Sequence, residues 1–410
     1  MTTKTDVLVI GAGPSGSVAA AYLAARGYSV EVVERVHFPR FSIGESLLPQ
    51  SMEFLEEAGL LDCVLAGHFQ HKNGAVFRRG NDEQSLDFRD KTASGWGTTF
   101  QVRRDLFDQI LARGAAEKGA HVVFGEEVIR FTPGEDGVQA LVRNENGVER
   151  EIEARFALDA SGFGRVLARL LSLDRPADFP VRKAVFSHVR DNISDVTFDR
   201  KKILVSIHPE NSAIWYWLIP LADGLSSIGA VGPEADLSAA GADNQAQLFN
   251  LVGQAERMNE LLANAEQIRP AGTITGYACK VDSLVGPGFA LLGNAAEFLD
   301  PVFSSGVTIA LKSAILAGKA LDRKFQGETV DWAFEFEEPL KIGIETFRSY
   351  VEGWYDASLQ EIIFSQPQRT TDVKRKIISV LAGYAWDTDN PFVRDPKRYL
   401  AAVQELGVAR

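Results

Sequence analysis

A short apolar run near the start of the chain has the pattern of a strand that is buried on both faces. Asp6–Ile10 is almost wholly aliphatic, as strands of parallel sheets are. The stretch Val18–Arg26 is rich in small residues and predicts a helix that Gly27 ends. A second apolar run, Ser29–Val33, finishes on Glu34. Together these residues predict one complete βαβ unit.

The middle of the chain carries two other patterns. Arg104–Lys118 predicts a helix with one apolar face. Short alternating segments over residues 121–155 predict a small antiparallel sheet, and Phe156–Ala160 predicts a buried strand that returns to the first sheet. Three longer segments, separated by turn-forming residues, predict a second sheet: Lys202–Ile207, Ala213–Ile219 and Ser226–Val231.

The last third of the chain returns to the first sheet at Phe289–Gly293 and begins a helix near Ser305. Helical patterns dominate from Asp331 onward. This order predicts a mixed α/β fold: a Rossmann-type nucleotide-binding domain, an interleaved antiparallel-sheet substrate domain and a C-terminal helical tail. We assign residues 1–75, 100–180 and 270–325 to the first, 76–99 and 181–269 to the second, and 326–410 to the tail.

The composition narrows the class of protein. The 410-residue chain has a formal net charge of −12, whereas a nucleic-acid partner requires a basic face. Cys63 and Cys279 offer neither metal-ligand spacing nor a disulfide framework. The sequence shows no leader-peptide pattern and no apolar stretch of about 18 residues. We therefore expect a cytoplasmic enzyme with no metal, no nucleic-acid partner and no membrane span.

The turn between the first predicted strand and helix reads Gly11-Ala-Gly13-Pro-Ser-Gly16. Gly11 permits a tight turn, Gly13 lets the backbone approach a pyrophosphate, and Gly16 lets the helix pack closely on the strand. The start of the helix offers free N–H groups to the anion. Glu34 is placed to accept hydrogen bonds from an adenosine ribose. These residues predict a dinucleotide site.

Later segments resemble the flavin monooxygenase-like proteins. Val102–Asp108 resembles their Val-x-Arg-x-x-Phe-Asp segment, Asp159–Gly162 their middle Asp-Gly motif, and Leu292–Ala296 with Asp300-Pro301 their third motif. Asn294 departs from that family, which has Asp there, but an amide still bonds ribityl hydroxyls. The resemblance implies that the cofactor is FAD. The residues that it places at the cofactor are Gly11, Gly13, Pro14, Ser15, Gly16, Glu34, Arg35, Ser46, Arg104, Val128, Asp159, Gly162, Gly293, Asn294, Asp300, Gly306 and Val307.

Three patterns within this framework resemble the flavin-dependent halogenases, over about residues 4–325. Gly44–Pro49 (Gly-Glu-Ser-Leu-Leu-Pro) is close to that family's Gly-Glu-(Ser/Ala)-x-x-Pro. Trp215–Pro220 (Trp-Tyr-Trp-Leu-Ile-Pro) matches its Trp-x-Trp-x-Ile-Pro signature. Lys72 lies 23 residues after Pro49, about where the family places its reactive lysine.

The resemblance implies a reaction and a role for each residue. Reduced FAD, oxygen and a halide at Ser305 and Gly306 would give hypohalous acid, which Lys72, as the catalytic lysine, would direct to an electron-rich aromatic carbon. Phe303 stands where tryptophan-specific members have a glutamate, which implies a phenol- or pyrrole-like substrate. The passage between flavin and substrate would be walled by Trp215, Trp217, Ile219, Pro220 and Phe303.

The resemblance also implies partners. Some members act on substrates tethered to a carrier protein, which the basic cluster Arg200–Lys202 would meet. The sequence shows no second dinucleotide unit for a nicotinamide, so reduced flavin would come from a separate NAD(P)H-dependent flavin reductase.

Other interpretations stay open from the residues alone. Two tryptophans at alternate positions of a strand also suit plain core packing, and a lone lysine is commonly a solvated surface amine. A geranylgeranyl-reductase-type enzyme and a flavin hydroxylase share the fold and much of the FAD framework. A non-catalytic flavin-binding protein would need the dinucleotide site only. The complete Trp-x-Trp-x-Ile-Pro segment favours the halogenase.

Overall fold

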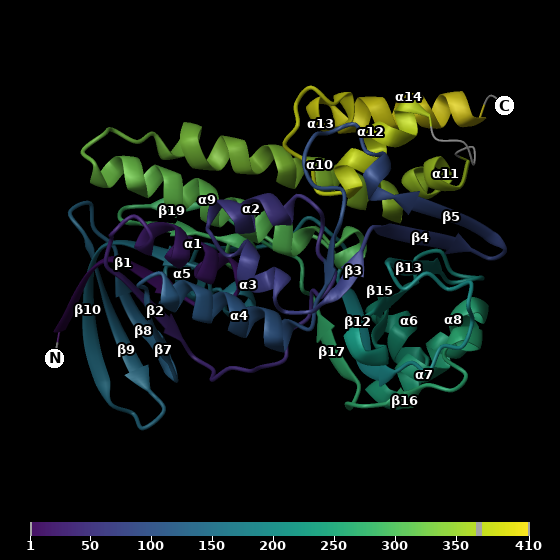
Figure 1. Ribbon diagram of the computed structural model, residues 1–410, viewed down its shortest axis with the longest axis horizontal. Helices are drawn as coiled ribbons and strands as arrows, with labels where there is room; N and C mark the ends of the chain where they lie inside the picture. Colours follow the sequence, from purple (N-terminus) through teal and green to yellow (C-terminus); the bar gives the residue numbers. More distant parts are fainter. Residues whose placement is uncertain (1, 366–370, 409–410) are drawn as a thin grey trace.

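Two large sheets form the body of the molecule, and helices cover them (Figure 1). The computed structural model describes residues 2–365 and 371–408. The first sheet has the strand order β19-β20-β10-β1-β2-β7, and its central pairs are parallel. Its strands are β1 Thr2–Ile10, β2 Val30–Glu34, β7 His121–Phe124, β10 Glu149–Asp159, β19 Val285–Gly286 and β20 Phe289–Leu291, with β8 Glu126–Thr132 and β9 Val138–Asn144 attached through β10.

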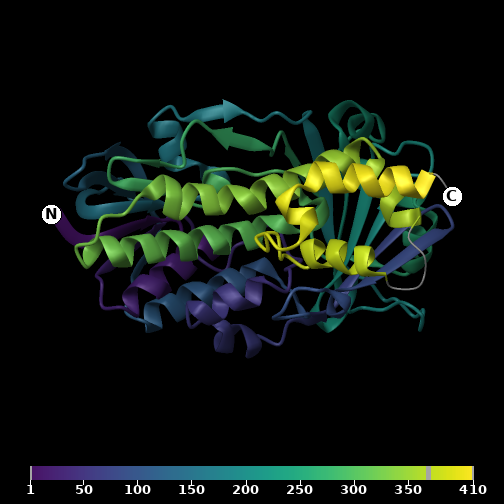
Figure 2. The same cartoon turned by 90° about the horizontal axis from the view of Figure 1, so that it is seen from above.

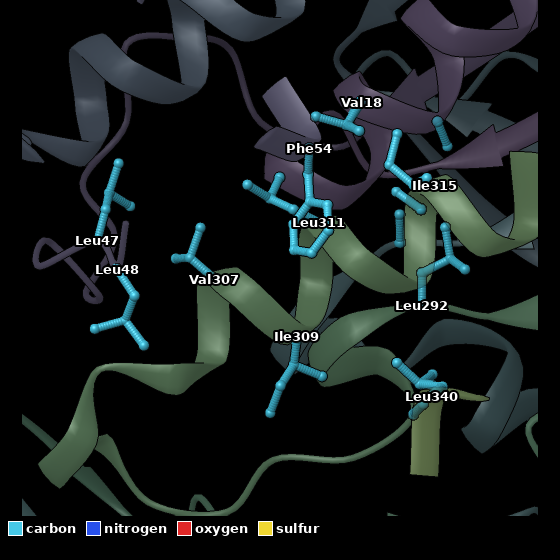
Figure 3. Close-up of a cluster of buried hydrophobic side chains, with 14 of the residues drawn as sticks. Val18, Leu47, Leu48, Phe54, Leu292, Val307, Ile309, Leu311, Ile315 and Leu340 are labelled. Atoms are coloured by element: carbon cyan, nitrogen blue, oxygen red, sulfur yellow. The ribbon is translucent and has the colours of Figure 1, made fainter. Parts of the chain in front are cut away.

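Helices α1 (Pro14–Ala24) and α9 (Ser305–Phe325) pack together against the first sheet. Figure 3 shows side chains of both helices meeting in the core, Val18 from α1 and Leu311 and Ile315 from α9. Further helices and short strands complete this half of the molecule: α2 Ser51–Glu57, α3 Leu61–Leu65, α4 Arg104–Glu117, α5 Val166–Leu170, β3 Gln70–Lys72, β6 Thr99–Gln101, β11 Asp174–Pro176 and β18 Cys279–Val281.

The second sheet is mainly antiparallel, with the order β16-β12-β15-β14-β13-β4-β5 and β17 paired to β12. Its strands are β4 Gly74–Arg79, β5 Asp82–Asp87, β12 Arg182–Arg190, β13 Lys202–Ile207, β14 Trp215–Pro220, β15 Leu225–Pro233, β16 Glu266–Gln267 and β17 Gly272–Thr275. One face packs against helices α6 Glu234–Ala239, α7 Asn244–Gln254 and α8 Glu256–Leu261. Along β14, Tyr216 and Leu218 point to these helices, whereas Trp215 and Trp217 join the main core between the sheets.

The C-terminal helices extend across both halves of the molecule (Figure 2). Helix α10 (Glu338–Tyr355) packs beside α9, α11 (Ser358–Ser365) contacts β5, and α12 (Asp372–Leu381) contacts the short turn η1 (Phe88–Asp90). Two more helices follow, α13 Pro391–Arg394 and α14 Pro396–Val408. The C-terminal region is therefore part of the core, and α10 alone buries Tyr350 and Trp354 completely.

The predicted mixed α/β fold with a helical C-terminal region is confirmed, and two predicted boundaries are wrong. Helix α1 begins at Pro14 rather than Val18, because Gly13 is its N-cap and proline suits the first turn. The predicted antiparallel segment and the returning strand Phe156–Ala160 are one strand, β10. Its residues 149–154 pair antiparallel with β9, and its residues 151–159 pair parallel with β1. Strand β17 belongs to the second sheet, although the predicted boundary at residue 270 assigns it to the first unit.

We expect Gly229→Ala to destabilise the protein, because Gly229 lies opposite Trp217 on β15. A Cβ at this position would lie 2.3 Å from the indole Cζ2, and overpacking of this kind costs about 1–3 kcal/mol. Calorimetry should therefore show a lower Tm. Gly253→Ala is the matched control: nothing lies within 4 Å of its added Cβ, and alanine favours the helix there. A Tm loss in both variants, or in neither, would contradict this packing argument.

Candidate functional site

A long cavity begins at the turn between β1 and α1, where the sequence predicts a dinucleotide site. Gly11 has a φ of +100°, and a Cβ on Gly16 would lie 1.9 Å from the Gly11 carbonyl oxygen. The turn can therefore form only with these glycines. Glu34 ends β2 beside it and accepts hydrogen bonds from the backbone N–H of Ala12 (2.9 Å) and Val36 (3.0 Å). This fixes its carboxylate at the edge of the cavity.

Arg104 holds the middle of the same cavity. Its guanidinium forms two hydrogen bonds with the buried Asp108, at 2.8 and 3.0 Å, and donates to the carbonyl of Ile43 at 2.5 Å. Arg40 approaches the same carboxylate at 3.3 Å. Two cations therefore flank one buried anion, and they leave positive charge along the wall, as a pyrophosphate requires.

The far end of the cavity lies between the second sheet and the start of α9. Trp215, Trp217 and Ile219 form one side, and Gly306 and Val307 form the other. The first N–H groups of a helix have no partner within the helix, so this end can hold an anion or a polar ring edge. A continuous cavity with a phosphate-binding turn, a cationic middle and an aromatic far end fits FAD.

Most of the predicted cofactor residues line this cavity, and some do not. Those on its wall are Gly13, Pro14, Ser15, Glu34, Arg35, Ser46, Arg104, Gly162, Asn294, Gly306 and Val307. Those away from it are Gly11, Gly16, Val128, Asp159, Gly293 and Asp300. Of the predicted passage wall, Pro220 and Phe303 lie behind the surface, and so does the predicted halide residue Ser305. The glycines shape the turns, and Val128 is a core residue of β8.

Two aspartates expected at the flavin instead bond to the protein. Asp159 is fully buried and accepts from the backbone N–H of Ser161 (3.0 Å) and Leu167 (2.6 Å), which holds the turn after β10. Asp300 accepts from the hydroxyls of Tyr277 (2.8 Å) and Tyr355 and from the Val302 N–H (3.0 Å). It fixes the loop that leads into α9 and so supports the cavity from behind.

Lys72 is fully buried beside the flavin cavity, and its ammonium has two close partners. It donates to the hydroxyl of Ser46 at 2.6 Å and to the carbonyl of Leu47 at 2.8 Å, and it lies 5.2 Å from the centre of the Phe88 ring. No carboxylate lies within 4 Å of it among the described residues. Burial lowers the pKa of Lys72 from 10.5 to about 7. The predicted surface-amine alternative is therefore wrong.

Polar side chains gather around this lysine. Lys72 pairs with Thr99 across β3 and β6, and Ser46 bridges to Gln101 on the other side of β6. Paired residues of antiparallel strands point to the same face. Thr99 Oγ1, Gln101 Oε1 and the adjacent Asn73 Oδ1 are buried and find no hydrogen-bond partner in the part of the chain that the structure describes. We call Ser46, Lys72, Thr99 and Gln101 the lysine chamber; its unpaired acceptors can take a polar guest.

Several contacts at the site join residues that are far apart in the sequence. Glu45 lines the cavity, is 2% exposed and lies 2.6 Å from His188 Nε2, which comes from β12. Tyr277 lines the cavity as well, and Tyr355 reaches Asp300 from the C-terminal helix α10. These partners are 23 to 143 residues apart in the chain, so no local motif could have predicted them.

The basic cluster Arg200–Lys202 is not a free patch. Arg200 bonds the Asp191 carboxylate at 2.8 Å and the carbonyls of Leu221 and Leu225, both at 3.0 Å. Lys202 pairs with Asp199 at 2.6 Å. Arg200 and Lys202 are therefore paired with carboxylates of the fold, and their charges are not free to bind an acidic carrier protein.

Residues 2–365 and 371–408 contain no group of three or more His, Cys, Asp or Glu side chains that could hold a metal ion. None of the helices in that part of the chain is long and apolar enough to cross a membrane.

Comparisons with known proteins agree with this geometry. A family model described as an FAD binding domain matches residues 4–335. The 1H-pyrrole-2-carbonyl-[peptidyl-carrier protein] chlorinase of Pseudomonas fluorescens is 29% identical over 98% of this chain and 94% of its own length. The tryptophan 2-halogenase of Chondromyces crocatus is 30% identical over 81% of this chain and 64% of its own length.

Solved structures match over almost the whole chain. A flavoprotein/dehydrogenase from Cytophaga hutchinsonii is 41% identical, with a TM-score of 0.95 over 99% of both chains. The flavin-dependent brominase Bmp2 is 25% identical, with a TM-score of 0.83 over 100% of both chains.

We expect the buried Lys72 to make stability depend on pH. Between its native pKa of about 7 and the ordinary lysine value, the unfolded chain binds more protons than the native protein, so native stability rises with pH. Raising the pH from 6.5 to 9 should stabilise the wild type by about 2–3 kcal/mol relative to Lys72→Met. Urea unfolding at several pH values measures this difference.

The control for this experiment is Lys201→Met, since Lys201 is exposed. The difference between its stability and that of the wild type should not change over the same pH range. A pH-independent difference for Lys72→Met would show that this amine keeps its ordinary pKa.

Proposed function

The chain belongs to the FAD binding domain family, and we propose that it is a halogenase that modifies an electron-rich aromatic substrate. It is an FAD-dependent oxidoreductase by its family and its relatives. What supports the halogenase most is one contact: the amine of Lys72 lies 2.6 Å from the hydroxyl of Ser46, and Ser46 lines the flavin cavity. A buried amine next to a flavin is an arrangement that FAD binding alone does not need.

Reduced FAD, when bound, would supply two electrons to oxygen, so that a halide is converted to hypohalous acid and the other oxygen atom leaves as water. Gly306 and Val307 at the start of α9 would hold an anion at the far end of the cavity. Trp215 and Trp217 wall this end with apolar rings, and such a wall keeps water from the oxidant.

Lys72 would then receive the hypohalous acid. A pKa of about 7 leaves a large share of the amine unprotonated at neutral pH, so it can accept or donate a hydrogen bond. Ser46 and the Leu47 carbonyl fix the amine within the lysine chamber. The halogen goes to the aromatic carbon, and the proton that this carbon loses leaves with the hydroxide as water.

We infer the substrate class from position 303 and from the relatives. Tryptophan-specific halogenases have a glutamate there that orients the indole. This chain has Phe303 instead, which packs edge-on against Tyr350 and Trp354 with ring centres 6.2 and 5.8 Å apart. The Pseudomonas fluorescens chlorinase acts on a pyrrole held by a carrier protein. We propose a phenol- or pyrrole-like substrate, presented free or on a carrier, with a separate reductase supplying reduced flavin.

A second candidate is a dehydrogenase. The structure of a flavoprotein/dehydrogenase from Cytophaga hutchinsonii matches this chain with a TM-score of 0.95. Such an enzyme would move a hydride to or from the flavin and would need neither a halide nor a free amine on Lys72.

Oxidation of the chemically reduced, FAD-loaded protein by oxygen, with and without bromide, tests the proposal. We expect the flavin to be reoxidised along a bromide-dependent course and a pyrrole or phenol probe to be brominated. A course that is indifferent to bromide and gives a hydroxylated probe would indicate a hydroxylase. Indifference without any modified probe would support the dehydrogenase.

Lys72→Met should reduce brominated probe at least 100-fold, since truncating a catalytic group costs several kcal/mol. The bromide-dependent reoxidation should continue, because Lys72 does not line the flavin cavity. Lys201→Met, on the exposed surface, should keep both activities. Equal bromination by wild type and Lys72→Met would contradict the assigned role.

A further inference from the structure

A second cavity lies on the other side of Tyr277 from the flavin. It measures about 190 Å³, which is room for one ring and a small substituent but less than a drug-sized ligand needs. Its mouth is formed by exposed residues of the loop before β12 and by Gly276. Its floor consists of the buried side chains Arg182, Tyr277, Leu299 and Asp300 together with Tyr355.

Arg182 is a buried, positively charged residue in the floor of this cavity. Only 9% of it is exposed. Its Nη1 donates to the Ala213 carbonyl at 2.8 Å, and its guanidinium lies 3.5 Å above the centre of the Tyr355 ring. Within residues 2–365 and 371–408, its buried Nε has no hydrogen-bond partner, and no carboxylate comes within 4 Å of the guanidinium.

The other charges around the cavity are already paired. Asp300 accepts hydrogen bonds from Tyr277, Tyr355 and the Val302 N–H. Lys280 pairs with Asp178 at 2.7 Å, and Arg348, which lies over the Phe179 ring, pairs with Glu297. Burial raises the pKa of Asp300, and the attraction of Arg182 for this carboxylate opposes that rise. The two groups form no direct ion pair, however, and a buried cation without one is costly. An N–H left unbonded adds to that cost. An anion beside Arg182 Nε would supply both the ion pair and the hydrogen bond.

The residues that line the cavity indicate the shape and polarity of the rest of the ligand. Three aromatic rings line the cavity, those of Phe179, Tyr277 and Tyr355, together with the rings of Pro176 and Pro180. Flat apolar surfaces of this kind pack against a planar ring. A guanidinium, in turn, matches the geometry of a carboxylate better than that of any other common organic anion except phosphate. Phosphate has no apolar body to occupy the remaining space.

We propose that this cavity binds a small aromatic carboxylate, with its carboxylate on Arg182 and its ring between Phe179 and the two tyrosines. The site is separate from the one proposed for halogenation, because neither Lys72 nor any other residue of the lysine chamber lines it. Tyr277 connects it to the flavin cavity, because this side chain lines both cavities. Occupancy of the second cavity will therefore alter the surroundings of the flavin ring.

Calorimetric titration of the FAD-loaded protein with benzoate, and separately with benzamide, tests the charge requirement. Benzamide has the same shape without the negative charge. We expect benzoate to bind at least tenfold more tightly, and its binding to shift the flavin absorption bands at constant FAD content. Equal affinity for the two probes, or no binding of benzoate, would overturn the proposal.

Arg182→Gln should weaken benzoate binding at least tenfold and leave benzamide binding nearly unchanged. Arg175→Gln is the matched control: Arg175 lies on the neighbouring strand β11, is about half exposed and pairs with Asp282. Ala177→Phe, which places a ring in the cavity from its half-buried rim, keeps Arg182 intact and should abolish binding of both probes even if Arg182→Gln fails to fold. Unchanged benzoate binding in Ala177→Phe would place the ligand elsewhere.

A crystal grown with 4-bromobenzoate locates the site directly, through the anomalous signal of its bromine. We expect a peak between Phe179 and Tyr277. A peak in the lysine chamber, with none between these rings, would mean that the acid binds as a substrate analogue and would overturn the second site. This result does not depend on whether the bromide experiment supports the halogenase.

Discussion

Asp300 accepts hydrogen bonds from two tyrosines and one backbone N–H, and the three donors belong to different parts of the fold. Tyr277 stands between the two cavities, Tyr355 ends the C-terminal helix α10, and Val302 lies in the loop before α9. The carboxylate is 2% exposed, and burial raises its pKa. Such a group is stable in the interior only when all its acceptors are used. The position of the α9 start, of α10 and of the wall between the cavities is therefore fixed together.

This constraint explains why the C-terminal helices cannot be regarded as an appendage. Helix α10 packs along α9 and buries Trp354 and Tyr350 against Phe303 (Figure 2). Helix α11 contacts β5, and α12 contacts η1, whose Phe88 ring lies 5.2 Å from the Lys72 amine. These helices therefore pack against elements that surround the lysine.

Burial affects the charges of Lys72 and Arg182 in different ways. Lys72 can lose its proton, and burial lowers its pKa to about 7, so the interior need not hold a charge there. Arg182 cannot lose its charge in this way, because a guanidinium stays protonated at every physiological pH. The first arrangement suits proton and halogen chemistry, and the second suits the permanent binding of an anion. The same low-polarity interior thus lowers the pKa of the Lys72 amine and leaves Arg182 as a permanent cation.

The sequence by itself determined the dinucleotide turn, the parallel strands around it and the family. Those features depend on neighbours in the chain: Gly11, Gly13 and Gly16 must be small for one tight turn, and a continuous aliphatic run marks a buried strand. It also placed Trp215 and Trp217 on one face and singled out Lys72. The tertiary structure alone decided which motif residues line the cavity. Asp159 accepts from the backbone N–H groups of the turn that follows it, and Asp300 accepts from two tyrosines 23 and 55 residues away. The fold alone also paired Glu45 with His188 and placed no carboxylate within 4 Å of Arg182 among the described residues. Hydrogen bonds and charges of buried groups are decided by the residues that the fold brings within 3 to 4 Å, and for Glu45 and Asp300 these include residues far away in the sequence.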